Sequence, residues 1–218
     1  MDGTLDSLLP SRAIWSGRVA TGGYLVRSGE PEDADLIREF VRGLSVRTQY
    51  LRFFTAVASP SPSLLRALAG GGPSPSDILL ITDEHGAVIG HGMAVDVNGD
   101  GVPCSDIGLV IADQWQGLGL GSMLVRLLAN RALERGVVAL VLEVLHGNTA
   151  MLGLIHKHWP QAMRQGTRDS IVITAVLAQR PFAAAGHTAV ASPSHASSSH
   201  GSPSYRRGHR DLRRPAAA

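Results

Sequence analysis

The chain has 218 residues, an apolar content of 44% and a formal net charge of +2, which allows one ordinary domain with a hydrophobic core. Positive charge is concentrated in residues 181–218, where five arginines accompany one aspartate, so residues 1–180 carry a net charge of about −2. The basic character therefore belongs to the C-terminal region, and it does not predict a nucleic-acid-binding domain.

Cysteine usage and hydropathy restrict the compartment. Cys104 is the only cysteine, so no intramolecular disulfide can form and a reducing environment is favoured. No run of eighteen apolar residues is present, and Asp2 and Asp6 stand where a signal peptide would be basic. We therefore expect a cytoplasmic protein without a membrane partner.

The first elements follow an irregular start. Residues 1–23 show no sustained hydrophobic period, so we expect a flexible leader before a folded domain over residues 24–178. Residues 24–28 alternate as a strand does. A helix is expected from Pro31, because proline suits the first helical position and acidic residues follow it.

Two shorter helices come next. Ser45 is a plausible N-cap for a helix on which Tyr50, Leu51 and Phe54 recur at helical spacing. A third helical piece at residues 64–69 ends at the glycines of residues 70–72.

Two strands, residues 78–82 and 87–97, lead to a turn at residues 98–101, and residues 96–101 have the D-x-N-x-D-G pattern of a calcium loop. The twelfth loop position should be a glutamate and is Ile107, and strands rather than helices lie on either side. A hairpin turn is the favoured interpretation, and we expect no metal site.

The remaining elements complete an α+β pattern. A strand near residues 107–112 leads through a glycine-rich turn into an amphipathic helix that stops at Gly136, and a buried strand (137–145), a helix (148–158) and a last strand (171–177) follow. Residues 179–218 are rich in Ser, Pro, His and Arg, so we expect a disordered basic tail, with weak binding of acidic partners as a lesser alternative.

The glycine-rich turn predicts an anion site. Gly117, Gly119 and Gly121 let the backbone approach a ligand closely, and the first N–H groups of the following helix have no intrahelical partner. A phosphate or pyrophosphate suits such a position.

Spacing separates the possible anion-binding motifs. A triphosphate-binding loop needs a lysine that is absent here. A dinucleotide fingerprint would need a third glycine where Ser122 stands, although Glu143 lies where a ribose-binding acid is expected. A glycine-rich connection without a ligand is a further alternative.

The third motif is Q-x-x-G-x-G, met by Gln116, Gly119 and Gly121 between a strand and a helix. It resembles the pyrophosphate-binding motif of the GNAT acetyltransferase superfamily, which binds acetyl-CoA. The resemblance implies a GNAT-like α+β fold, with a central mixed, mostly antiparallel sheet flanked by helices. The residues that it implies as contacts of acetyl-CoA are Val110, Ile111, Gln116, Gly117, Leu118, Gly119, Leu120, Gly121, Ser122 and Asn148.

A narrower resemblance lies upstream. Residues 43–54, GLSVRTQYLRFF, are similar to a segment of the bacterial protein lysine acetyltransferases that modify acyl-CoA synthetases. A short core helix whose aromatic residues only pack is the alternative interpretation of this segment.

Acetyl transfer from a thioester to an amine needs a general base, because a lysine ammonium is not nucleophilic at neutral pH. By the resemblance, the base stands seven positions before Asp113, at Asp106, where the family has Glu. Backbone N–H groups near Val110 or Ile111 would stabilise the developing oxyanion. Cys104 as a covalent nucleophile is a lesser alternative, since no histidine is fixed beside it by sequence.

The helix after Asn148 departs from the superfamily pattern. The position of the usual tyrosine is Ile155, so the general acid is missing. His156 is a candidate substitute for it, and protonation by solvent is the alternative, because a thiolate is a good leaving group. Asn148 is expected either to bind the pantetheine of the cofactor or to cap its helix.

The sequence therefore predicts an acetyl-CoA-dependent N-acetyltransferase that acts directly on an amine, favouring a lysine of a protein such as an acyl-CoA synthetase. A small amine or an antibiotic is the alternative acceptor. A non-catalytic acyl-CoA sensor is an alternative from a different class, and a nucleic-acid-binding protein that works through the arginine-rich tail is another.

Overall fold

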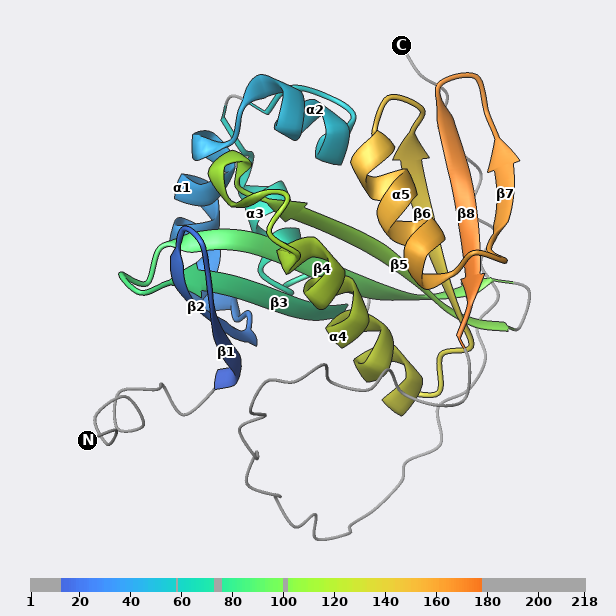
Figure 1. Ribbon diagram of the computed structural model, residues 1–218, viewed down its shortest axis with the longest axis horizontal. Coiled ribbons are helices and arrows are strands. Elements are labelled where there is room, and N and C mark those ends of the chain that lie inside the picture. Colours follow the sequence, from blue (N-terminus) through green and yellow to red (C-terminus); the bar gives the residue numbers. More distant parts are fainter. Residues whose placement is uncertain (1–12, 58, 73–75, 100–101, 178–218) are drawn as a thin grey trace, which may run out of the picture.

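The computed structural model describes residues 13–57, 59–72, 76–99 and 102–177. Within them one mixed sheet has the order β1-β2-β3-β4-β5-β6-β8-β7 (Figure 1). The expected basic tail, residues 179–218, lies outside the described residues. The strands are β1 (Ala13–Val19), β2 (Gly22–Ser28), β3 (Ser76–Asp83), β4 (Val88–Gly99), β5 (Val102–Ile111), β6 (Ala139–Leu145), β7 (Met163–Gly166) and β8 (Ser170–Val176).

In the same described ranges, five α-helices and two short 3-10 helices accompany these strands. None of the helices in the described part is long and apolar enough to cross a membrane. They are η1 (Pro31–Asp33), α1 (Ala34–Gly43), α2 (Val46–Phe53), α3 (Pro62–Leu68), η2 (Asp113–Trp115), α4 (Leu120–Glu134) and α5 (Thr149–His158).

One pair of neighbouring strands differs from all the others. Every neighbouring pair is antiparallel except β5 and β6, which are parallel and pair only where Cys104–Asp106 face Ala139–Val141. Beyond this short contact β5 continues beside β4 alone and β6 beside β8 alone, so the two strands diverge (Figure 1). The expected α+β fold with a mixed, mostly antiparallel sheet is confirmed.

Helices cover both faces of the sheet, and the alternation of side chains in β3 shows how. Leu79 and Ile81 pack with residues of α4 in the larger core, whereas Ile78 and Leu80 pack with α1 and α3 in a second core. Side chains of a strand point alternately to opposite faces, so one apolar run serves both cores. Burial of this kind on both faces supplies the main stabilisation of the fold.

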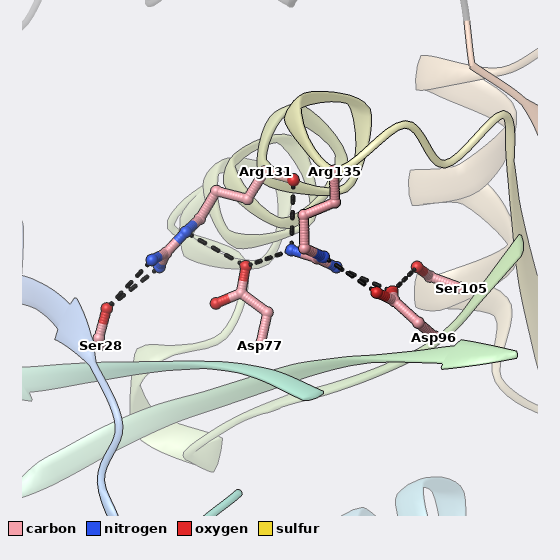
Figure 2. Close-up of polar contacts among 6 residues, drawn as sticks. All are labelled: Ser28, Asp77, Asp96, Ser105, Arg131 and Arg135. Atoms are coloured by element: carbon pink, nitrogen blue, oxygen red, sulfur yellow. Dashed lines mark hydrogen bonds and ion pairs between the residues drawn. The ribbon is translucent and has the colours of Figure 1, made fainter. Parts of the chain in front are cut away.

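The C-terminal turn of α4 is fixed to the sheet by charged groups (Figure 2). Arg131 Nε and Arg135 Nη1 lie 3.2 Å and 2.9 Å from Asp77 Oδ2 of β3. Arg135 also binds Asp96 of β4 at 3.0 Å, and Ser105 of β5 donates to Asp96 at 2.5 Å. Asp96 is the first position of the calcium-loop pattern, and here its carboxylate is already bound by protein groups.

The expectation of a flexible leader through residue 23 is wrong for residues 13–23, because strand β1 pairs with β2. Trp15 is buried in the larger core. The hydrophobic alternation of this strand is hard to detect because Gly17 has no side chain. The glycine is needed for packing, since a Cβ on Gly17 would lie 2.6 Å from the hydroxyl of Tyr24. Residues 1–12 lie outside the described residues.

The alternative interpretation of the upstream segment, a core helix whose aromatic residues pack inward, holds for Phe53 of α2 but not for Tyr50 or Phe54. Tyr50 is 49% exposed and Phe54 is 39% exposed, whereas Thr48 and Gln49 are buried. The Gln49 amide donates to the carbonyls of Val41 and Leu44, both at 3.1 Å. Polar bonding of Thr48 and Gln49 therefore helps to set which face of α2 is buried.

Candidate active site

The glycine-rich turn has the backbone that the sequence implied. Gly117 and Gly119 have φ values of +75° and +86°, a backbone conformation that residues with a side chain rarely adopt. Gly119 is the N-cap of α4. No atom lies within 4 Å of a Cβ built at either position, so the space above both residues is open. Unpaired N–H groups of the first helical turn and the helix dipole make this turn suited to an anion.

Gly121 has a different role. A Cβ at this position would meet Leu154 of α5 at 3.3 Å and Leu109 of β5 at 3.6 Å. The third glycine therefore lets α4 pack closely against α5 and β5.

A groove of about 500 Å³ runs over this turn between β5 and α5. Leu118 and Leu120 do not line it, and Leu120 is only 2% exposed and belongs to the core. Any contribution of Leu120 to an anion is limited to its backbone N–H. The eight other residues expected to contact the cofactor do line the groove: Val110, Ile111, Gln116, Gly117, Gly119, Gly121, Ser122 and Asn148.

The segment that contains Ser45 and Thr48 holds α2 onto the turn. Asp113 accepts hydrogen bonds from the N–H and the hydroxyl of Ser45 at 2.9 Å and 2.6 Å, and from the Thr48 hydroxyl at 2.7 Å. The amide of Gln116 donates to the Ile111 carbonyl at 2.9 Å and to Thr48 at 3.3 Å. Sequence reasoning used Asp113 only as a position to count from, and missed this link.

A second cavity, of about 350 Å³, lies where β5 and β6 diverge. Its charged lining residues are Asp106, Glu143 and Arg52. Arg52 also lines the groove, as do Leu109 and Met151, so the two spaces meet at these residues. A thioester in the groove and an amine in the cavity would meet at this junction.

Asp106 lies in the middle of β5, not at its start as expected, because the strand begins at Val102. It faces Val95 of β4 and Val141 of β6, so it is not a turn residue. Burial raises the pKa of Asp106, the charge of Arg52 opposes this, and the charge of Glu143 adds to it. A general base is most efficient when its pKa lies near the working pH, so a raised pKa makes Asp106 a better base at neutral pH.

Arg52 brings a positive charge to the cavity. Its Nε is buried without a hydrogen-bond partner. Burial lowers the pKa of the guanidinium, and Asp106 opposes that effect. The charges of Arg52 and Asp106 act on each other, although the two residues form no ion pair within the described part of the chain.

Three other candidates are also placed. Asn148 caps α5, since its Oδ1 accepts from the N–H of Met151 at 3.1 Å, and it lines both spaces. Cys104 is partly buried and lines neither space. His156 is exposed and also lines neither, and Ile155 is buried in the core.

The signals for Glu143 and Arg52 as site residues were present in the sequence. Glu143 interrupts the otherwise apolar β6, ALVLEVL, and Arg52 belongs to the RFF triplet of the upstream segment. Sequence reasoning assigned Glu143 only to the dinucleotide alternative and gave Arg52 no role.

The sequence matches the model of the acetyltransferase (GNAT) family over residues 45–158, which is more than half of its length. The chain therefore belongs to the GNAT acetyltransferase family. None of the curated proteins matches it significantly.

Solved structures agree with this fold. The GNAT domain of S. lividans PAT has 20% identity and a TM-score of 0.66, with 78% of this chain and 99% of that one covered. Spermidine N-acetyltransferase from Vibrio cholerae, in complex with CoA and spermine, has 15% identity and a TM-score of 0.54, with 71% and 95% covered. A cAMP-binding acyltransferase from Mycobacterium smegmatis has 20% identity and a TM-score of 0.52, with 82% and 54% covered. At these identities the likeness establishes the fold alone.

Proposed function

We propose that the protein transfers the acetyl group of acetyl-CoA directly to an amine, and that the amine is a lysine of another protein. The observation that carries the proposal is the continuity of two spaces: a groove over an anion-binding turn opens, at Arg52 and Leu109, into a cavity that contains carboxylates. The groove suits a pyrophosphate at its glycine end, and the cavity suits a cationic amine.

Asp106 is the proposed base. Its carboxylate takes a proton from the acceptor ammonium, and the free amine attacks the thioester carbon. The C–N bond forms and the C–S bond breaks as the tetrahedral intermediate collapses. The nitrogen loses two protons in all, of which one ends on the CoA thiol and one passes to solvent. Backbone N–H groups near Val110 and Ile111 are the proposed donors to the oxyanion.

The charges of the cavity favour an acceptor with one ammonium. Two carboxylates and one guanidinium leave a formal charge of −1, which complements a lysine side chain better than a polyamine. The similarity of residues 43–54 to the protein lysine acetyltransferases that modify acyl-CoA synthetases supports a protein acceptor of that kind. A cytoplasmic location remains part of the proposal.

A small amine or an antibiotic is the second candidate acceptor, favoured by the confined volume of about 350 Å³. A non-catalytic acyl-CoA sensor is the third possibility. It would keep the glycine turn and need no carboxylate in the neighbouring cavity.

The test is release of CoA thiol from acetyl-CoA by the purified protein, with and without an AMP-forming acyl-CoA synthetase. We expect synthetase-dependent release that Asp106→Asn reduces at least about a hundredfold, within the usual effect of a general base. Release that ignores the substitution would reject Asp106 as the base. Saturable binding of acetyl-CoA without release onto any amine would favour the sensor.

A further inference from the structure

The second carboxylate of the cavity has no role in the reaction described so far. Glu143 is the only charged residue of β6, and its side chain is exposed although its neighbours Leu142 and Val144 are buried. It lines the cavity together with Asp106, which belongs to the strand that diverges from β6. The two carboxylates therefore lie on opposite sides of one cavity, Asp106 on β5 and Glu143 on β6.

A hydroxyl of the neighbouring strand fixes Glu143. Ser170 of β8 is 3% exposed and donates to Glu143 Oε1 at 2.6 Å. Ser170 in turn is bound through Thr167, whose hydroxyl lies 2.8 Å from that of Ser170. One carboxylate oxygen is thus occupied, and this bond orients the side chain as a pre-organised acceptor of a further hydrogen bond.

We infer that Asp106 and Glu143 form a two-carboxylate subsite for the primary ammonium of the acceptor, in which Glu143 anchors the ammonium while Asp106 removes its proton. An ammonium has three donors and no acceptor, so it can bind both carboxylates at once. The inference rests on the proposed function, because it assigns a second residue to the same acceptor.

The electrostatic environment is consistent with this division of roles. The groups that face Asp106 are Arg52 from α2 and Glu143 from β6, and Ser170 from β8 faces Glu143. Burial raises the pKa of Asp106, and the charge of Glu143 adds to this effect. A raised pKa suits Asp106 to the role of the base, which leaves Glu143 as the anchor.

The decisive experiment measures binding of Nα-acetyl-lysinamide, which carries one primary ammonium, to the CoA-saturated protein by NMR titration. Nα-acetyl-norleucinamide, which lacks the ammonium, is the ligand control. We expect Glu143→Gln to weaken binding of the lysine compound by about tenfold or more, as removal of a charged hydrogen-bond partner does. Glu143→Asp should restore part of the affinity. Glu134→Gln, the same substitution at an exposed position on α4, should change nothing.

A second measurement separates anchoring from a structural role. The carboxyl carbon of Asp106, assigned with Asp106→Asn, should titrate at a lower pH in Glu143→Gln than in the parent. Ser170→Ala should weaken binding less than Glu143→Gln, because it releases the carboxylate but keeps its charge. If Ser170→Ala and Glu143→Gln weakened binding equally, the role of Glu143 would be limited to its hydrogen bond with Ser170, and the inference would be overturned.

The other outcomes of these measurements also test the two-carboxylate subsite. Equal affinity of the parent and Glu143→Gln for the lysine compound, or no preference of the parent for it over the norleucine compound, would overturn the inference. Failure of the proposed function has a different signature: ammonium binding and the shift in the titration of Asp106 would persist, and no thiol would be released from acetyl-CoA with any amine.

Discussion

The guanidinium of Arg52 packs directly against the backbone of Gly108, beside the point where β5 leaves β6. A Cβ on Gly108 would overlap the Nη1, Nη2 and Cζ atoms of Arg52. This contact makes a glycine in β5 a requirement for a positive charge in the cavity, since only the absence of a side chain gives the guanidinium its place.

Gly108→Ala should therefore move Arg52 rather than unfold the protein, because the displaced atoms are the end of a flexible side chain. We expect a loss of stability below about 1 kcal/mol, at the low end for an added methyl group. The KM for the amine should change several-fold while the affinity for CoA stays within twofold. Steady-state kinetics and calorimetric binding of CoA check this, with Gly43→Ala, where nothing lies within 4 Å of the added atom, as the control.

Gly119→Ala should reduce the affinity for CoA. Alanine at φ of +86° is strained by about 1 kcal/mol, and relief of the strain would rotate N–H groups out of the anion site. We expect the Kd for CoA to rise by tenfold or more, with a small fall in Tm. Unchanged affinity for CoA in a folded Gly119→Ala protein would mean that the phosphates bind elsewhere.

Asp113→Asn should destabilise the contact between α2 and the glycine turn. Burial acts to raise the pKa of Asp113, but the hydrogen bonds from Ser45 and Thr48 outweigh it and hold the pKa below its ordinary value. A depressed pKa means that the stabilisation is present above the pKa of the unfolded chain and is lost as the pH falls through the folded pKa.

The free energy of unfolding of Asp113→Asn should therefore lie about 1 kcal/mol below that of the parent at pH 7, since charged hydrogen bonds are weakened. The difference should shrink as the pH is lowered through the folded pKa of Asp113. Urea unfolding at pH 7 and at a series of acidic pH values measures it. A difference that is constant across this range would attribute the effect to shape and not to charge.

Buried His91 predicts a second dependence on pH. The imidazole is 1% exposed, its Nε2 lies 2.8 Å from the Leu68 carbonyl, and its Nδ1 has no hydrogen-bond partner. Burial lowers the pKa of His91 to about 4. The folded protein thus keeps a neutral ring over a range in which the unfolded chain binds a proton, so stability is full above about pH 6.5 and falls toward pH 4.

The loss that His91 contributes over this range is about 3 kcal/mol at most, from the size of the shift in pKa. His91→Gln should be less stable than the parent at pH 7, and its stability should fall less between pH 7 and pH 4. Thermal unfolding at several pH values tests both expectations, and parallel curves for the two proteins would exclude His91 as the source.

The elements that the sequence predicted best are those with strong local signals. The apolar runs of β3 and β6 and the glycine stop of α4 at Gly136 needed no tertiary information. Ser45 was recognised as an N-cap, and its hydroxyl does accept from the Thr48 N–H at 3.2 Å.

The elements that were missed depend on long-range pairing. All four residues of β7 are exposed, so no hydrophobic period marks this strand, and its pairing with β8 defines it. The aromatic residues of α2 have a core-like spacing, but Gln49 and Thr48 hold the opposite face to the protein. The apolar surroundings of Glu143 single it out in the sequence, but only the divergence of β5 and β6 shows that it shares a cavity with Asp106.

Within the described residues, the two halves of the sheet are joined along a short ladder of three residue pairs between β5 and β6, a contact that we call the seam. The depth of the cavity is set by where this pairing of β5 and β6 ends. Each further residue pair, beginning with Ile107 and Leu142, would close part of the space between the two strands. Selection for a more stable sheet and selection for access to the reacting atoms thus act in opposite directions on the same few backbone groups. A variant of this protein that gained stability by lengthening the seam would do so at the expense of its cavity.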